Sequence, residues 1–205
     1  VEKMRSLLIS LISFFCLSLY AGDNATEVRI KGSSTVIYID QIGTSNVTRV
    51  WCGLSEGTYT THNCSNATID IDQNGIGNTA RAYSQVANHT GNEYKIEQDG
   101  NDNFGYIDAD DDSNDMDIIQ NGNNNDAEIY MQGDNNNYKI TQTGNDKEGE
   151  IRAFGDSSEF NITQSGSGEH YAKIYASGAA DNNDADITQT GSGDHYMRLN
   201  FYTDD

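Results

Sequence analysis

The chain has no proline, one tryptophan and three cysteines in 205 residues, and only 35% of its residues are hydrophobic. So little apolar material does not build an ordinary globular core, and on composition alone it favours disorder. Basic residues are scarce as well, because 12 lysines and arginines face 32 acidic residues, for a formal charge of -20. This charge repels phosphate backbones and argues against a nucleic-acid partner. A solubilising surface is the simplest interpretation, with basic surfaces or divalent cations as alternative partners.

The one long apolar stretch lies at the start of the chain. Lys3 and Arg5 precede the run from Leu7 to Leu19, and Ala21 follows it as a cleavage point. This order predicts a secretory signal peptide over residues 1–21, with a retained membrane anchor as the alternative. The run is short for a membrane span, so we expect none in the mature chain.

Removal of the signal would leave two cysteines, Cys52 and Cys64, an even number in an exported protein. They bound an insertion at residues 51–66. We therefore predict a disulfide between them that closes a loop and stabilises the fold by about 3 kcal/mol.

What the chain does have is a motif repeated seven times. Its glutamines are spaced by 32, 25, 22, 22, 22 and 25 residues, which is typical of a stacked solenoid. An isoleucine comes two positions before each glutamine, and a glycine two positions after it. The glutamines are Gln41, Gln73, Gln98, Gln120, Gln142, Gln164 and Gln189. The isoleucines are Ile39, Ile71, Ile96, Ile118, Ile140, Ile162 and Ile187. The glycines are Gly43, Gly75, Gly100, Gly122, Gly144, Gly166 and Gly191.

Each repeat is predicted to be a strand, a turn and a second strand. In residues 158–164, Phe160, Ile162 and Gln164 alternate with polar residues, so they share one face of a strand. Glycine and a following asparagine suit the turn. Lys147, Glu169 and Asp194 replace that asparagine in the last three repeats. Small and larger apolar positions then mark the second strand, shifted by one residue in the last two repeats.

The predicted fold is therefore all-β, a β-solenoid of about seven stacked strand-turn-strand rungs with two facing parallel sheets in a cross-β arrangement. Residues 22–35 would form an N-terminal segment with a candidate partial rung, and residues 36–205 the solenoid. A buried glutamine must satisfy its amide, and a ladder running from rung to rung does so. The end rungs would lack partners, and no capping element is evident in the sequence, so each end is a template for another chain.

The repeat resembles the curlin repeat of bacterial curli fibre subunits. Residues 158–166 are very similar to one, and residues 70–80 carry the Gln, Gly, Asn and Ala positions together. The resemblance covers about residues 36–201. It implies a secreted subunit that polymerises with itself into extracellular, cell-surface amyloid fibres for biofilm matrix, adhesion and cell aggregation. It also implies a nucleator subunit and an outer-membrane secretion channel as partners.

Other signals are weaker. Asp108, Asp110 and Asp112 resemble part of a calcium loop but lack its glycine and its final acid, so we expect a solvated turn, with diffuse calcium bridging as an alternative. His170 and His195 occupy matching positions. We expect exposed turn residues there, with a shared metal site as the alternative. We expect no cofactor.

No arrangement of serine, cysteine or carboxylate residues indicates catalysis, so we expect a non-enzymatic protein. The main competing hypothesis is a monomeric β-solenoid that binds a ligand, such as ice or a glycan. The pairs Thr141/Thr143 and Thr188/Thr190 would suit an ice-binding face, but Asp40, Asp72, Glu97 and Ile119 interrupt the array. A polysaccharide-active β-helix enzyme is the third hypothesis.

Overall fold

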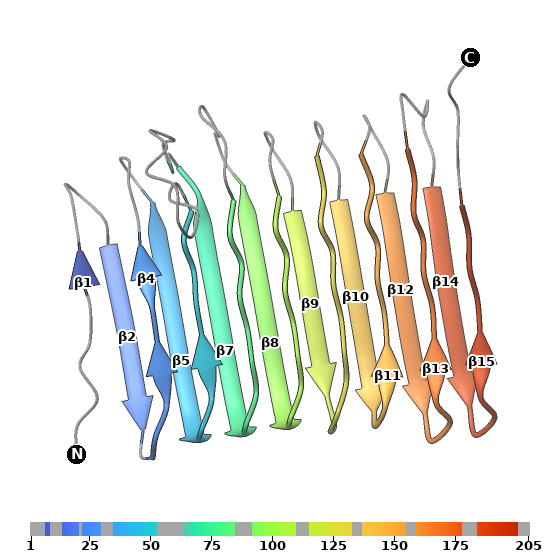
Figure 1. Cartoon of the computed structure of the whole chain (residues 1–205), viewed down its shortest axis with the longest axis horizontal. Helices are drawn as coiled ribbons and strands as arrows, with labels where there is room; N and C mark the ends of the chain where they lie inside the picture. The colour runs from blue at the N-terminus through green and yellow to red at the C-terminus, as the bar shows by residue number, and fades with distance from the viewer. Residues whose placement is uncertain are drawn as a thin grey trace.

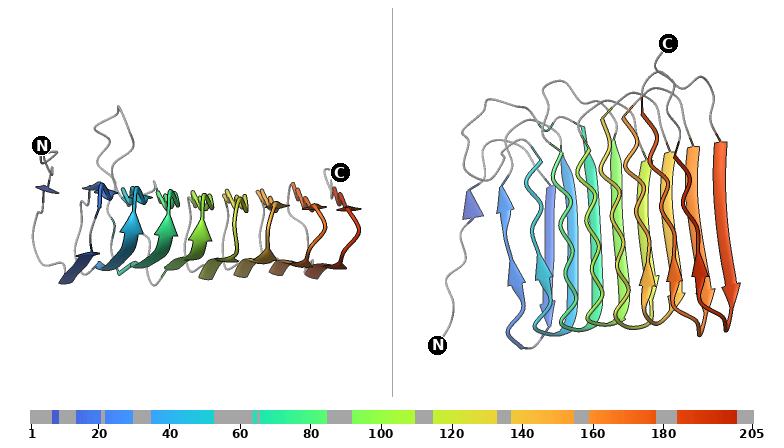
Figure 2. Two further views of the ribbon diagram at one scale, coloured as in Figure 1. Left: turned by 90° about the horizontal axis from the view of Figure 1, so that it is seen from below. Right: turned by 45° about the vertical axis from the view of Figure 1, so that its right-hand side comes forward.

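The computed structural model describes residues 7–8, 14–20, 22–29, 35–52, 64, 66–84, 92–109, 115–132, 137–154, 159–177 and 184–200. In these residues the chain is all-β and contains no helix, so none of the described segments is a helix that could cross a membrane. The strands stack side by side along one axis in two facing layers, with the termini at opposite ends (Figure 1, Figure 2). The predicted class, a parallel β-solenoid, is confirmed.

The first layer is one parallel sheet of eight strands, here named the long sheet. Its strand order is β14-β12-β10-β9-β8-β7-β5-β2. The strands are β2 (Phe14–Tyr20), β5 (Val36–Thr44), β7 (Thr68–Ile76), β8 (Glu93–Asn101), β9 (Asp115–Asn121), β10 (Asn137–Gly144), β12 (Glu159–Gly166) and β14 (Asp184–Gly191).

The register of the long sheet keeps identical positions of the repeat in line. Ile140 pairs with Ile162, and Gln142 with Gln164, and the same alignment holds along the sheet from β5 to β14. The period-two pattern explains this register, because a shift by one residue would turn every buried side chain to the solvent.

The second layer is less regular than predicted. It contains only short strands, namely β1 (Leu7–Leu8), β3 (Ala25–Thr26), β4 (Val28–Arg29), β6 (Val47–Thr48), β11 (Lys147–Glu148), β13 (His170–Tyr171) and β15 (His195–Tyr196). Isolated parallel bridges at Thr79, Phe104 and Asp126 link β6 to β11. The predicted second strand of each repeat is thus present only as these short strands and bridges. Several residues after these bridges have positive φ, such as Ile107 (81°) and Arg152 (102°), and this rotates their peptide groups out of the ladder.

The core lies between the two layers. Ile71, Ile96, Ile118 and Ile140 of the long sheet are fully buried, and so are Ile129, Ile151 and Ile174 of the second layer. The small column fits because it faces isoleucines: a Cβ added at Gly105 would lie 2.9 Å from Cγ2 of Ile96. A thin core of this kind needs few apolar residues per rung, which reconciles the composition with a folded chain.

The number of rungs differs slightly from the predicted seven. The seven repeats supply β5 to β14, and β2 adds an eighth strand to the long sheet beside β5. β1 and β2 come from residues 1–21, whose removal as a signal peptide stays a prediction. Residues 22–29 follow as a half-rung in the second layer, where β3 pairs with β6.

Candidate functional site: the glutamine column and its two ends

Seven glutamines form a buried column along the long sheet. Each Nε2 donates a hydrogen bond to Oε1 of the glutamine on the next strand, in six steps of 2.8–3.0 Å from Gln41 to Gln189. All seven side chains are at most 5% exposed. Since a buried amide without partners would cost about 1–3 kcal/mol, the column is stable only when it is continuous.

The same amides also tie the two layers together. Nε2 of Gln73 donates to the carbonyl of Val47 in the preceding rung at 3.1 Å, and Gln142 donates to the carbonyl of Asp126 at 2.6 Å. The series ends with Gln189, whose Nε2 donates to the carbonyl of Tyr171 at 2.7 Å. The six glutamines from Gln41 to Gln164 therefore each donate one hydrogen bond along the stack and at least one across it.

The glutamine column has a direction, so its two ends are chemically different. All side-chain bonds point from the N-terminal rung to the C-terminal rung. At the C-terminal end Gln189 has no further glutamine to donate to, and its Nε2 bonds only to backbone carbonyls of Tyr171 and His195. At the N-terminal end Oε1 of Gln41 accepts from the hydroxyl of Thr26 at 2.6 Å. Among the described residues, Gln189 thus lacks a glutamine acceptor beyond it, and Gln41 lacks a glutamine donor before it.

The turn glycines are required twice over. Gly75 has φ 131° and Gly122 has φ 138°, which is unfavourable for other residues. A Cβ on either would also collide with the carbonyl oxygen of the glycine in the next rung. Gly191 differs, because a Cβ there would meet only Cε1 of His195, at 3.9 Å. Among the described residues no rung packs against this last turn, so the space beside Gly191 is open.

A second polar column runs through the turns. Oδ1 of Asn78 accepts from the backbone N–H of Asn103 at 3.0 Å, and its Nδ2 donates to the carbonyl of Gly100 at 2.8 Å. The same two bonds recur along Asn46, Asn78, Asn103 and Asn125. The asparagines thus link each turn to its neighbours in both directions.

In the last three repeats, other residue types replace the asparagines of this second column. Lys147 is 1% exposed, and its Nζ donates to the carbonyl of Gly168 in place of an asparagine amide. Burial lowers the pKa of this ammonium, although Asp146 and Glu169 oppose the shift. His170 and His195 follow Lys147 in register. The expectation that Glu169 and Asp194 replace asparagine is therefore wrong, because the extra residue in these turns lies before that position.

The expectation that His170 is an exposed turn residue is also wrong. His170 is 1% exposed, its ring centroid lies 4.7 Å from that of His195, and neither ring nitrogen has a hydrogen-bond partner among the described residues. Burial, followed by the nearby Lys147 charge, lowers the pKa of His170. A neutral imidazole is therefore favoured next to the buried ammonium.

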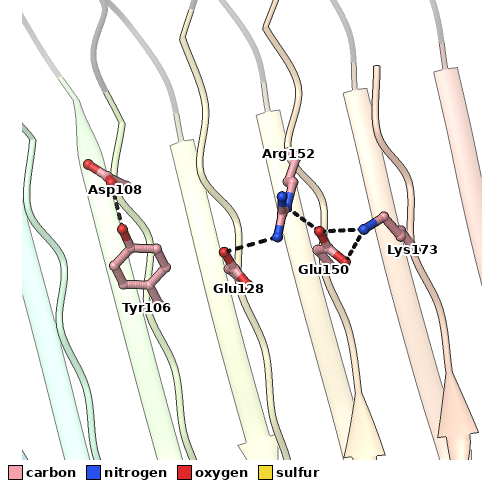
Figure 3. A network of polar contacts seen from close by, with 6 residues as sticks. All are labelled: Tyr106, Asp108, Glu128, Glu150, Arg152 and Lys173. Atoms are coloured by element: carbon pink, nitrogen blue, oxygen red, sulfur yellow. Dashed lines mark hydrogen bonds and ion pairs between the residues drawn. The ribbon is translucent and has the colours of Figure 1, made fainter. Parts of the chain in front are cut away.

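Figure 3 shows a group of polar contacts along the second layer. Glu150 forms ion pairs with Arg152 and Lys173, and Arg152 also lies 3.9 Å from Glu128. Asp126 lies near this network, and burial together with Glu148 and Glu128 raises its pKa to about 6. This part of the second layer carries both signs of charge but holds an excess of carboxylates in its middle.

One of the three calcium candidates, Asp108, lies within the described residues. Asp108 is 7% exposed and accepts a hydrogen bond from the hydroxyl of Tyr106 at 2.6 Å (Figure 3). Asp110 and Asp112 lie outside the described residues. Within the described ranges, no group of three or more His, Cys, Asp or Glu side chains is arranged to hold a metal ion.

The predicted disulfide is present. Cys52 and Cys64 are bonded with their Cα atoms 5.3 Å apart, and both are buried. The hydroxyl of Thr35 donates to the backbone carbonyl of Cys64. The disulfide therefore closes the insertion at the edge of the core, and the loop at 53–63 lies outside the described residues.

Comparison with known families bears directly on this geometry. The family model of the curlin associated repeat matches residues 112–144, which include β9 and β10. We call this matched segment the curlin segment. The curlin segment pairs in register with β8 on one side and β12 on the other, so its neighbours repeat its geometry. Comparisons with curated proteins and with solved structures gave no match.

Proposed function

We propose that the chain is a secreted structural subunit that polymerises end to end into an extracellular, curli-like amyloid fibre. The matched curlin repeat belongs to a structural, non-enzymatic family. In this proposal residues 1–21 are removed on export, so β5 becomes the N-terminal edge of the long sheet and β14 remains the C-terminal edge. The fibre would serve biofilm matrix, adhesion and cell aggregation.

The observation that carries the proposal is the polarity of the glutamine column. Nε2 of Gln189 bonds to the carbonyls of Tyr171 and His195, and Gln164 makes the two equivalent bonds and still donates to the next glutamine. Gln189 could therefore donate in the same way to Oε1 of Gln41 in another copy. Gln73 shows how such an oxygen is used inside the stack, because it accepts from Gln41 at 2.8 Å and from Thr48 at 2.8 Å. A second copy could continue the column in the same direction, since a carbonyl oxygen has two lone pairs.

Both sheet edges support this proposal. Among the described strands β14 has one neighbour, β12, so its other side presents backbone groups that a parallel strand could pair with. Ile187 on this strand is already 3% exposed, so a docked copy would cover backbone groups more than apolar surface. Specificity would then come from register, because only one alignment places glutamine on glutamine.

The test is direct. The purified chain of residues 22–205 should form filaments by negative-stain microscopy, and aligned filaments should diffract at about 4.8 Å along the fibre and about 10 Å across it. A protein that stays monomeric across pH and salt would overturn the proposal and favour the monomeric ligand-binding solenoid. A nucleator subunit and a secretion channel follow from the same proposal, and co-expression with curli export machinery tests the channel.

A further inference from the structure

Residues 22–29 lie beside the second-layer strand of the first repeat, where the second-layer strand of a further rung would lie. The backbone N–H of Ala25 donates to the carbonyl of Asn46 at 2.8 Å, and that of Glu27 to the carbonyl of Thr48 at 3.3 Å. Val28 is 6% exposed and packs in the core cluster. Asn24 takes the asparagine position, since its Oδ1 accepts from the backbone N–H of Asn46 at 2.9 Å. These residues are the second-layer half of a rung.

This half-rung covers the acceptor end of the glutamine column. Thr26 donates to Oε1 of Gln41, and Nε2 of Gln41 donates to the carbonyl of Ala25 at 3.4 Å. Thr48 and Val47 serve Gln73 in the same way one rung further on. Gln73 also receives the amide of Gln41 at 2.8 Å. Among the described residues, Oε1 of Gln41 accepts only from Thr26, so a second donor could use its other lone pair.

The C-terminal rung has a backbone carbonyl equivalent to the carbonyl of Ala25 that accepts from Gln41. The carbonyls that accept from the glutamine of the following rung are those of Val47, Thr79, Phe104, Asp126, Glu148 and Tyr171. Tyr196 pairs with Tyr171 and is next in this series. In a docked pair of copies, the carbonyl of Tyr196 would serve Gln41 of the next copy, while Gln189 would donate to its Oε1.

In a docked pair of copies, residues 22–29 of one copy and residues 195–199 of the other would occupy the same position. Without residues 1–21, the chain has seven strands in the long sheet, β5 to β14, but eight positions in the second layer, because residues 22–29 precede the seven repeats. If β14 of one copy pairs directly with β5 of the next, residues 195–199 of the first copy must lie where residues 22–29 of the second copy lie. The register places Glu27 beside Arg49, whereas docking would bring Arg198 there, so charge favours the half-rung in the monomer.

We propose that residues 22–29 are a displaceable cap on the N-terminal end of the stack, and that a second copy docks by replacing this half-rung with its own residues 195–199. The inference rests on the proposed fibre function and on removal of residues 1–21. It assigns a barrier to subunit addition that lies within the subunit and differs between the two ends.

A covalent lock tests the cap. Ala25→Cys with Val47→Cys joins register partners of β3 and β6, and Thr79→Cys with Phe104→Cys joins two inner rungs as the matched control. Each disulfide is verified by mass, and elongation from wild-type seeds is measured before and after reduction. The oxidised cap lock should elongate at least about tenfold more slowly than the oxidised control, and reduction should restore its rate to that of the reduced control.

A second pair of variants keeps the test informative if a lock fails to form. Thr26→Val removes the hydroxyl that holds the cap to Gln41 and should speed seeded elongation several-fold. Thr48→Val makes the same change inside the stack and should not speed it. Equal elongation rates for the cap lock and its control, or for the two valine variants, would overturn the cap. If the wild-type protein and the inner lock also fail to elongate, the fibre proposal itself fails.

Discussion

A side chain at Gly191 should affect folding of the monomer and assembly of the fibre differently. In the six earlier repeats a Cβ at the turn glycine would collide with the carbonyl of the next rung, whereas at Gly191 that space is open. We predict that Gly191→Ala folds as a monomer, with a loss of about 1–3 kcal/mol from its φ of 118°. In a fibre its Cβ would meet Gly43 of the next copy, so seeded elongation should stop.

Gly122→Ala is the matched control for this prediction, because it has a similar φ but a following rung. It should lower the Tm of the monomer clearly more than Gly191→Ala does. Thermal unfolding by circular dichroism and elongation by thioflavin fluorescence separate the two effects. Wild-type elongation by the Gly191→Ala protein would contradict direct docking of β14 on β5.

Lys147 is the residue at which the asparagine column loses an acceptor. Its ammonium donates to the carbonyl of Gly168, but it offers no oxygen to the backbone N–H of His170. We predict that Lys147→Asn stabilises the chain by about 1 kcal/mol, because it restores an acceptor and removes a buried charge. The gain should grow as the pH falls from above 10.5, the ordinary value, through the lowered pKa of Lys147, because protonation in that range opposes folding, and it should be constant at lower pH.

Denaturant unfolding of Lys147→Asn at two pH values measures this gain. Lys139→Asn is a suitable control, because Lys139 lies on the outer face and pairs with Asp117 at 3.2 Å. That replacement should be neutral or slightly destabilising. A destabilised Lys147→Asn protein would show that the lysine stem packs better than an asparagine in this turn.

At the scale of the element, the acidic middle of the second layer contributes to the pH dependence of stability. Asp126 has a pKa raised to about 6, so its folded form binds a proton more tightly than its unfolded form. Its contribution to stability is therefore full below about pH 4 and lost as the pH rises through 6. We predict that Asp126→Asn raises the Tm at pH 7.5 and leaves it nearly unchanged at pH 4.

Glu159→Gln provides the control for Asp126→Asn, because it removes one carboxylate from an exposed position on β12. If both variants raise the Tm equally at pH 7.5, the effect comes from net charge and not from the surroundings of Asp126. Thermal unfolding over a pH series distinguishes these outcomes.

The elements also show which parts of the fold the sequence could predict. The long strands were predictable because alternation of buried and exposed residues is strict there, as in the burial pattern of β10. The irregular second layer was not, since positive φ at Ile107 or Arg152 leaves no glycine or asparagine as a signal. The place of His170 was missed because an inserted residue can lie on either side of it. The half-rung at Asn24, Thr26 and Val28 was recognisable only as a candidate, although these residues lie 22 positions before Asn46, Thr48 and Val50.

At the scale of the whole molecule, the charge of -20 opposes the association that the column ends favour. Asp70 and Asp72, two residues apart on β7, already have raised pKa values, mainly from burial, so ionising these carboxylates opposes folding. Docking would add a second copy with the same charge. The fibre should therefore form fastest where this charge is screened or neutralised.

We predict that the lag time shortens as the pH falls from about 7.5 to about 5.5, because Asp126 titrates within this range. Raising the salt concentration at pH 7.5 from about 0.02 to about 0.5 M should shorten it as well, because the Debye length falls from roughly 20 to roughly 4 Å. Calcium and magnesium at equal ionic strength separate screening from specific bridging: equal lag times indicate screening, and a shorter lag with calcium indicates bridging between carboxylates. A lag unchanged by both pH and salt would mean that displacement of the N-terminal half-rung, and not charge, limits the first docking step.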